Sequence, residues 1–550
     1  MWSNALREVK VVTGLPGPPR TLLARMVVAM RLIVRRRLSY HLAANVFFFL
    51  CGTALASDDL TQPLRVSADG HFLIEPDGGP FFWLGDTAWS LFMRLNRDET
   101  DEYLKDRAAK GFTVIQAVVM GGPADRLDVP NREGALPLLH RDPRSPNPKY
   151  FEHVDWVVDR AAHYGLRIAM LPVWGSAVFG GYLDDNQDHV FDPKTSEVYG
   201  RWIAQRYRGK GIIWVLGGDT NPIGVRTVQV GDKILQPTDL TIRDFRPLYD
   251  SMAKGIIDGE GGKPMISYHL TCCSWLGTAK PRTSLYLGDR SWLTVNMLQS
   301  SHFRHPNSQT LFPGVAFAWD GTRNYEPIRD EYDSMPTRPV IDGEPRYEDL
   351  TVDVETDPKA IESKGYWTAY DARNAAYHAV FAGAAGHTYG NASAWQFYDP
   401  SHFPAVPPVR EGLTWRKALQ QPGAGEMQYL KNLMLSRPYL TRIPDQSVLV
   451  SATGDGEEHV EATRDKAGDY MMIYTPKGQP VEVDLSKLSG LHAIGWWFDP
   501  RSGAATRIQT EVPTTGAMRF SPPSSGSDTD WVLVLDNASR GFSAPGVVPR

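Results

Sequence analysis

Eight short apolar segments alternate with segments of helical periodicity between residues 81 and 390, and this alternation constrains the fold more than any other feature. The apolar segments span residues 81–85, 112–120, 166–174, 212–218, 264–270, 292–302, 338–345 and 387–390. Strands that are apolar on both faces and are joined by helices are typical of a parallel sheet. Eight such units in about 300 residues favour a closed (β/α)8 barrel over an open doubly wound sheet, whose nucleotide-binding glycine motif we do not find.

The sequence changes character after residue 442. Short strand-like segments are separated by turns rich in Gly, Pro, Asp and Ser, and they lie at residues 447–452, 469–476, 481–485, 492–500 and 530–536. This spacing predicts a small antiparallel β-sandwich. We therefore expect an α/β chain in which a barrel over residues 62–441 precedes a β-sandwich over 442–540 and a tail over 541–550. The sandwich would brace the barrel or bind glycan; Trp496 and Trp497 are adjacent and would point to opposite faces of a strand.

Residues 1–56 are organised like an export signal. Basic residues from Arg31 to Arg37 precede an apolar run over 43–55, which ends in Ala54-Leu55-Ala56, a small-x-small pattern typical of signal-peptidase sites. The run is shorter than the about 20 residues that a spanning helix needs, although an uncleaved anchor is the alternative. We expect an exported protein, periplasmic or extracellular, with no stable membrane insertion.

Composition excludes several classes of protein. The formal net charge is −5 and no long basic run lies outside the N-terminus, so a nucleic-acid partner is not expected. The chain has 3 cysteines, of which Cys51 belongs to the predicted signal. Cys272 and Cys273 could form a vicinal disulfide, but we expect two free thiols. Zinc-ligand spacings, phosphate-binding glycine loops and nucleophile elbows are not found, so neither metal nor cofactor is expected.

Two carboxylates stand where barrel strands end and catalytic loops begin. Asp219 follows the fourth strand and Glu344 the seventh; each comes after glycine and is closely followed by proline. In a closed barrel these strands lie on facing parts of the wall, and a pair of carboxylates flanking one bond is what glycoside cleavage requires. The glycines before Asp219 would let the backbone turn and a sugar approach closely. Taken singly, either acid could instead be a helix cap or a salt-bridge partner.

Other polar and aromatic residues after the strands are candidates for substrate binding. They are Asp86, Trp89, Trp174, Asn221, His269, Gln299, His302, Tyr347 and Trp395. Tryptophans could form sugar-stacking walls or belong to the core. Structural alternatives remain for the polar residues as well: Asp86 could cap a helix, Asn221 could cap the turn, and the histidines could be buried hydrogen-bonding groups.

The motifs FFWLGDTAWSLF, GGDTNP, QSSH and DGEPRYE, with the Ala/Gly-rich helix before HTYG, resemble the apiosidase-like glycoside hydrolases of family 140 over residues 62–440. The β domain resembles a module labelled as a collagen-binding domain of a collagenase. The resemblance implies a retaining enzyme with Asp219 as acid/base and Glu344 as nucleophile. It also implies a β-apiosyl substrate in pectin, such as apiose on galacturonic acid in rhamnogalacturonan II. Most relatives in the wider group of barrels have Asn-Glu after strand four, whereas this chain has Gly218-Asp219.

We therefore expect an exported retaining glycoside hydrolase acting on an oligo- or polysaccharide, with the oligomeric state left open. One alternative is a non-catalytic carbohydrate-binding protein, which would keep the aromatic wall but need neither acid. A collagen-binding or proteolytic role is the other, and no nucleophile–base or metal motif in the sequence supports proteolysis.

Overall fold

The computed structural model describes residues 59–179, 190–226, 229–230, 233–234, 241–273, 280–305, 319–406 and 409–549. Residues Ser57–Arg550 form one compact unit, which contains the barrel and the β domain. The predicted signal over 1–56 lies outside the described residues. Among the residues that are described, no helix combines the length and the apolar character needed to cross a bilayer.

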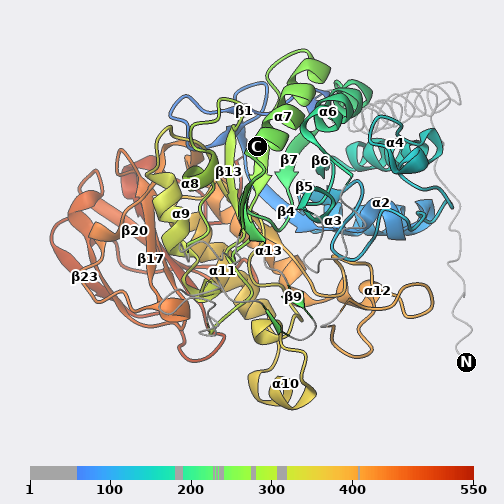
Figure 1. The fold of residues 1–550 in the computed structure, drawn as a ribbon. Helices are drawn as coiled ribbons and strands as arrows, with labels where there is room; N and C mark the ends of the chain where they lie inside the picture. Colours follow the sequence, from blue (N-terminus) through green and yellow to red (C-terminus); the bar gives the residue numbers. More distant parts are fainter. Residues whose placement is uncertain are drawn as a thin grey trace, which may run out of the picture. The chain divides into compact units, whose positions relative to one another are not determined.

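Eight parallel strands close into a barrel (Figure 1), in the order β4-β5-β6-β7-β12-β13-β14-β15. The strands are β4 (Trp83–Thr87), β5 (Val114–Val118), β6 (Arg167–Leu171), β7 (Ile213–Gly217), β12 (Ile266–His269), β13 (Val295–Leu298), β14 (Val340–Asp342) and β15 (Gly386–Tyr389). Every residue in these strands is buried. Burial on both faces explains their continuous apolar character, and the predicted (β/α)8 fold is confirmed.

Helices follow the strands and cover the barrel. They are α2 (Leu91–Arg94), α3 (Arg97–Ala109), α4 (Pro148–His163), α5 (Ser176–Phe179), α6 (Pro193–Tyr207), α7 (Arg246–Glu260), α8 (Thr283–Leu287), α9 (Tyr325–Tyr332), α10 (Pro358–Lys364), α11 (Ala369–Phe381), α12 (Trp415–Ala418) and α13 (Pro422–Leu435). Capping interactions define where several of these helices begin or end. Asn96 and Glu99 form a reciprocal capping box at the start of α3, and α7 ends on Gly261 in the left-handed conformation.

Short strands lie outside the barrel wall. A small antiparallel sheet of β1 (Arg65–Val66), β2 (Leu73–Ile74) and β3 (Pro80–Phe81) precedes β4. Two antiparallel pairs follow β7, and they join β8 (Ile223–Arg226) to β11 (Thr241–Asp244) and β9 (Gln229–Val230) to β10 (Lys233–Ile234).

Two antiparallel sheets form the C-terminal β domain, as predicted. The larger has the order β16-β17-β18-β24-β20-β21 with β22 paired to β20, and the smaller joins β19 to β23. Their bounds are β16 (Arg442–Pro444), β17 (Glu461–Asp465), β18 (Tyr470–Thr475), β19 (Val481–Asp484), β20 (His492–Phe498), β21 (Ala505–Arg507), β22 (Val512–Pro513), β23 (Ala517–Phe520) and β24 (Trp531–Asn537). The predicted strand at 447–452 is wrong, because a 3-10 turn occupies Gln446–Val448.

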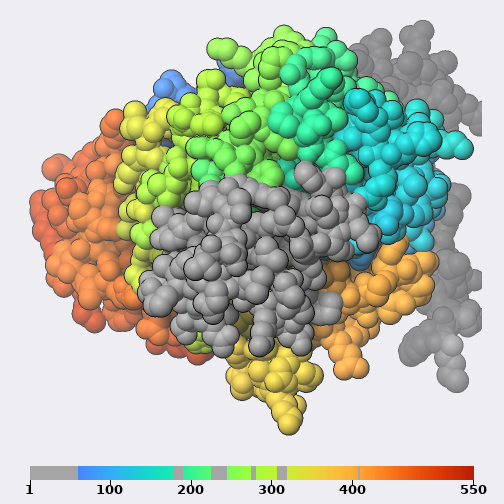
Figure 2. All heavy atoms as spheres, viewed as in Figure 1, coloured from blue at the N-terminus to red at the C-terminus, as the bar shows by residue number. Residues whose placement is uncertain are grey.

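The β domain packs against the barrel through buried rings and charges. Tyr474 of β18 stacks on Tyr377 of α11 with ring centroids 4.9 Å apart. The guanidinium of Arg373 on α11 contacts the carboxylate of Asp530 at 2.9 Å, and both side chains are buried. Figure 2 shows the orange and red atoms of the β domain adjoining the yellow atoms of barrel segments. These contacts favour bracing as the domain's role.

Candidate active site

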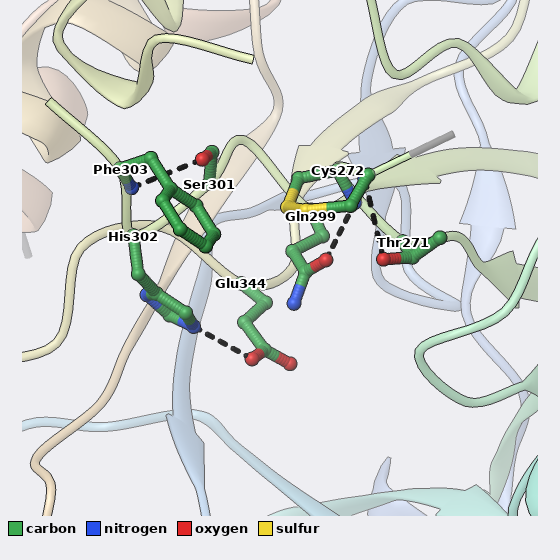
Figure 3. The surroundings of a disulfide bond; sticks show 8 residues. Thr271, Cys272, Gln299, Ser301, His302, Phe303 and Glu344 are labelled. Carbon is green, nitrogen blue, oxygen red and sulfur yellow. Dashed lines mark hydrogen bonds and ion pairs between the residues drawn. A yellow bond between two sulfur atoms is a disulfide. The ribbon is translucent and has the colours of Figure 1, made fainter. Parts of the chain in front are cut away.

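The carboxylate of Glu344 lies just beyond β14 and is held through both oxygens. His302 Nε2 lies 2.9 Å from Glu344 Oε1, and His269 Nε2 lies 3.2 Å from Glu344 Oε2. A carboxylate can only accept, so His302 donates through Nε2. Figure 3 shows Glu344 beside His302 and Gln299, with the ion pair to His302 dashed. Strands β12, β13 and β14 thus bring His269, His302 and Glu344 together from three separate parts of the chain.

The surroundings of Glu344 favour its ionised form. Burial is the largest single influence and would raise the pKa of Glu344, but hydrogen bonding and the electrostatic influence of His269 and His302 together outweigh it and hold the pKa well below its usual range. The side chain is 8% exposed. Glu344 is therefore a buried carboxylate that stays charged at neutral pH.

Asp219 lies just beyond β7, in a turn of residues with positive φ. The φ angles are 82° at Gly217, 110° at Gly218 and 52° at Asp219. A Cβ atom on Gly218 would lie 2.6 Å from the ring of Trp174, and one on Gly217 would lie 2.7 Å from the carbonyl oxygen of His269. Glycine is required at both positions, and aspartate tolerates the left-handed conformation better than most residues. At Gly218 it is Trp174, rather than a sugar, that makes the close approach.

His269 connects the two acidic residues. The backbone N–H of Asp219 donates to His269 Nδ1 at 3.2 Å. A ring nitrogen that accepts a hydrogen bond carries no proton, so the proton of the neutral ring is on Nε2, which faces Glu344. The ring therefore fixes the turn of Asp219 and presents an N–H group to the carboxylate of Glu344.

Tyr347 lies close to both acids. Burial, with the negative charges of Glu344 and Asp219, raises the pKa of its hydroxyl well above the usual range. The hydroxyl donates to Oγ1 of Thr87 at 3.2 Å, and its ring lies 4.6 Å from the ring of His302. Tyr347 therefore remains a neutral hydrogen-bond donor at the end of the barrel where the acids lie.

Three predicted aromatic residues lie around this centre. Trp89 and Trp174 have ring centroids 5.0 Å apart, and the Trp89 ring meets the His269 ring edge-on at 5.3 Å. Trp395 packs against the hydrophobic cluster that contains Tyr347. These rings form an apolar surround for His269 and Tyr347, which contact the acids.

Gln299 and Asn221 occupy different settings. Gln299 Oε1 accepts a hydrogen bond from the backbone N–H of Cys272 at 2.5 Å. The side-chain oxygen of Asn221 is buried and accepts no hydrogen bond from the residues that are described. Cys272 and Cys273 form a vicinal disulfide, so the expectation of two free thiols is wrong; the turn after β12 brings both sulfur atoms to one side.

Asp86 does not join the centre, because its carboxylate is paired with residues of α3. Its carboxylate lies 2.8 Å from Arg107 Nε and accepts a hydrogen bond from the Tyr103 hydroxyl, and both partners belong to α3. Neighbouring residues of a strand point to opposite faces. Because Thr87 contacts Tyr347 on the inner side of the barrel, Asp86 faces the helix layer. There its carboxylate pairs with the buried guanidinium of Arg107.

Two residues outside the predicted set of site residues support the centre. Gln116 of β5 donates through Nε2 to the carbonyl oxygen of Gly343 at 3.0 Å, so it reaches from β5 to the residue before Glu344. Trp367 donates its indole N–H to the carbonyl oxygen of His302 at 3.0 Å. A glutamine within the apolar strand VIQAV was the available signal for Gln116, whereas no local pattern marks Trp367.

Within the described ranges, no group of three or more His, Cys, Asp or Glu side chains is arranged to hold a metal ion. The arrangement offers a charged carboxylate, a second acid on the adjoining turn, and the side chains of His269, His302 and Tyr347 beside them.

Comparisons with known proteins identify the family to which the chain belongs. Residues 67–441 match the family described as "Apiosidase-like, catalytic domain", and residues 443–536 match "Putative collagen-binding domain of a collagenase". A family 5 glycoside hydrolase from Bacteroides vulgatus is 29% identical, with a TM-score of 0.74 over 89% of this chain and 96% of that one. A second structure, described as a glycoside hydrolase, is 31% identical, with a TM-score of 0.72 over 87% of this chain and 98% of that one. No curated protein matches. The catalytic-domain match covers more than half of the sequence, and the chain therefore belongs to the apiosidase-like family of glycoside hydrolases.

Proposed function

We propose that this enzyme is an exported retaining glycoside hydrolase in which Glu344 is the nucleophile and Asp219 is the acid/base. The observation that carries the proposal is the carboxylate of Glu344, contacted on both oxygens by histidine nitrogens. A nucleophilic carboxylate must be ionised, and this environment lowers its pKa. The second acid needed for the reaction stands on the turn that His269 fixes.

In the first step, an oxygen of Glu344 attacks the anomeric carbon and forms a covalent glycosyl ester. The bond from the anomeric carbon to the leaving oxygen breaks at the same time, and Asp219 gives that oxygen its proton. The N–H groups of His269 and His302 hold the carboxylate in position for the attack. These contacts cost no reorganisation during the reaction, because they exist before the sugar binds.

In the second step, Asp219 removes a proton from water, and the water oxygen attacks the anomeric carbon. The bond to Glu344 breaks, so the carboxylate is regenerated and the sugar leaves with its original anomeric configuration. Tyr347 keeps its proton throughout, and its hydroxyl donates a hydrogen bond to Thr87. Trp89 and Trp174 are buried rings that pack beside His269 and help to hold it in place.

The proposed substrate is a β-apiosyl linkage of pectin, such as apiose on galacturonic acid. The name of the matching family supports this choice. Export is supported by the signal-like N-terminus and by the Cys272–Cys273 disulfide, because disulfides persist mainly in oxidising compartments.

Purified enzyme incubated with rhamnogalacturonan II fragments tests the proposal. We expect release of free apiose, and proton NMR of the first product should show the anomeric configuration of the substrate. An inverted product would overturn the roles given to the two acids. Release of another sugar from a panel of β-glycosides would overturn the proposed substrate, but the proposed catalytic mechanism would stand.

A non-catalytic binding protein makes the opposite prediction. Titration calorimetry would then show saturable heat with pectic oligosaccharides, while no reducing sugar accumulates over a long incubation. Collagen, included in both assays, should be neither bound nor cleaved.

A further inference from the structure

The Cys272–Cys273 disulfide lies beside the candidate nucleophile. Cys272 follows β12, the strand that ends on His269, and Figure 3 shows the disulfide next to Gln299, with Glu344 below them in that view. Cys272 is 4% exposed, and Cys273 is partly exposed. A bond between adjacent cysteines closes a small ring that contains their shared peptide bond, so it restricts the backbone there far more than a distant crosslink would.

The hydrogen bond from Cys272 establishes which way the amide of Gln299 faces. The N–H group of Cys272 can only donate, so the Gln299 atom 2.5 Å away must be the carbonyl oxygen Oε1. The amide nitrogen Nε2 is consequently on the other side of the amide. In Figure 3 it points away from Cys272, on the side where the carboxylate of Glu344 also lies.

Gln299 is also tied to Glu344 through the backbone. The N–H of Ser300, the next residue, donates to the carbonyl oxygen of Glu344 at 3.0 Å. The amide of Gln299 therefore has its position fixed at one end by the turn that carries the nucleophile and at the other by the disulfide-closed turn. Side-chain amides without such partners rotate among several rotamers, and ordering them on binding costs free energy.

We propose that the Cys272–Cys273 disulfide is a positioning element that orients Gln299, so that Nε2 donates a hydrogen bond to a hydroxyl oxygen of the sugar bound at Glu344. The inference rests on the proposed function. It makes Gln299 a determinant of specificity, because a sugar lacking that hydroxyl would leave a buried amide N–H without a partner. The disulfide itself touches no reacting atom and acts through Gln299.

A double-mutant cycle on the purified full chain tests this mechanism. The variants are Cys272→Ser/Cys273→Ser, Gln299→Ala and the combination of all three changes. We expect the serine pair to raise KM by about 3- to 10-fold, the range of one hydrogen bond, with a smaller change in kcat. In the Gln299→Ala background the serine pair should have almost no further effect, because the group that it orients is gone.

A matched control separates the effect of losing the disulfide from the effect of disturbing the turn in some other way. Thr271 Oγ1 accepts a hydrogen bond from the N–H of Cys273 at 3.3 Å. Thr271→Ala removes this contact but keeps the disulfide, so KM should stay within about twofold of wild type. Reduction of the wild-type enzyme, verified by thiol alkylation and mass spectrometry, should reproduce the KM of the serine pair and also covers the case in which that variant does not fold.

The outcomes distinguish this inference from the proposed function. Fully additive effects of the serine pair and Gln299→Ala, or an unchanged KM after verified reduction, would overturn the inference while hydrolysis by wild type still stands. A wild-type enzyme that cleaves no glycoside would overturn the proposed function, and the inference would fall with it.

Discussion

His302 Nε2 lies 2.9 Å from Oε1 of Glu344, and this contact helps to keep the carboxyl group ionised inside the barrel. His302→Phe removes the donor but keeps a ring beside Tyr347. The pKa of Glu344 should then rise, because burial opposes the charge and only His269 remains to offset it. A nucleophile is lost when it is protonated, so the acidic limb of kcat/KM should move to higher pH.

The pH profile of the variant checks this prediction. His305→Phe serves as the control, since His305 contacts Asp353 on an exposed part of the chain rather than Glu344. Its acidic limb should coincide with that of wild type. An acidic limb that His302→Phe leaves in place would contradict the role given to His302.

Glu344→Gln should abolish turnover while the fold is retained. Glutamine has the shape of glutamate but cannot form the glycosyl ester, so we expect kcat to fall by at least about 10³-fold. Glu348→Gln is the matched control. Burial raises the pKa of Glu348 to about 7, so a neutral side chain there resembles a form that is already populated near neutral pH. Steady-state rates should differ between the variants by orders of magnitude, and equal rates would remove Glu344 from the chemistry.

Gly218→Ala should displace the acid on the next residue. The new Cβ would lie 2.6 Å from the ring of Trp174 at a backbone φ of 110°, so the turn must shift. A misplacement of about 1 Å can cost roughly 10²-fold in rate. Gly209→Ala introduces a comparable left-handed strain at φ +74° but meets no atom within 4 Å. That control should lose some thermal stability and keep its kcat; equal losses of kcat would point to strain alone.

The buried ring of His387 should make the protein sensitive to acid. Burial lowers the pKa of His387 to about 3, with the charge of Arg346 acting in the same direction, whereas an unfolded histidine has the model value of 6.5. Between these values the unfolded chain binds the extra proton. Acidification therefore lowers the free energy of unfolding, by up to roughly 1.4 kcal/mol per pH unit for this group.

Denaturant unfolding between pH 6.5 and 5 measures that slope. His387→Asn should reduce the slope of unfolding free energy against pH by up to roughly 1.4 kcal/mol per pH unit, the contribution of one bound proton. This holds even if the substitution lowers stability at every pH. His492→Asn, at an exposed position, should keep the wild-type slope. An unchanged slope in His387→Asn would show that another group accounts for the sensitivity to acid.

The barrel was predictable because its strands are buried on both faces and therefore carry an unbroken apolar signal. Asp219 and Glu344 were identifiable for a related reason: the strand order alone determines which residues meet at one end of a barrel. Strand β17 was missed because Glu461 and Asp465 interrupt its apolar pattern. Glu461 is fully buried and paired with Arg329 of α9 at 2.7 Å, and a partner so distant in sequence leaves no local sign.

The direction in which neighbouring side chains point was not predictable from the sequence. Asp86 and Thr87 are consecutive and polar, and nothing in their order says which of them faces the inside of the barrel. The thiols of Cys272 and Cys273 posed the same difficulty, because their bonding depends on the conformation of a single turn. The two glycines did indicate the sharp bend before Asp219. They did not indicate that the indole ring of Trp174 lies where a side chain at Gly218 would have to go.

The buried ion pairs between barrel and β domain have a consequence for the modularity of the chain. Arg373 and Arg437 belong to the barrel segment, yet each pairs with a carboxylate of the β domain, Asp530 and Asp536 respectively. A barrel cut off at residue 441 would remove the carboxylate partner of Arg437 and leave Arg373 with Glu426 alone, in a newly exposed apolar face. We therefore expect the two segments to unfold as one cooperative body, so that neither could be moved to another protein as an independent module.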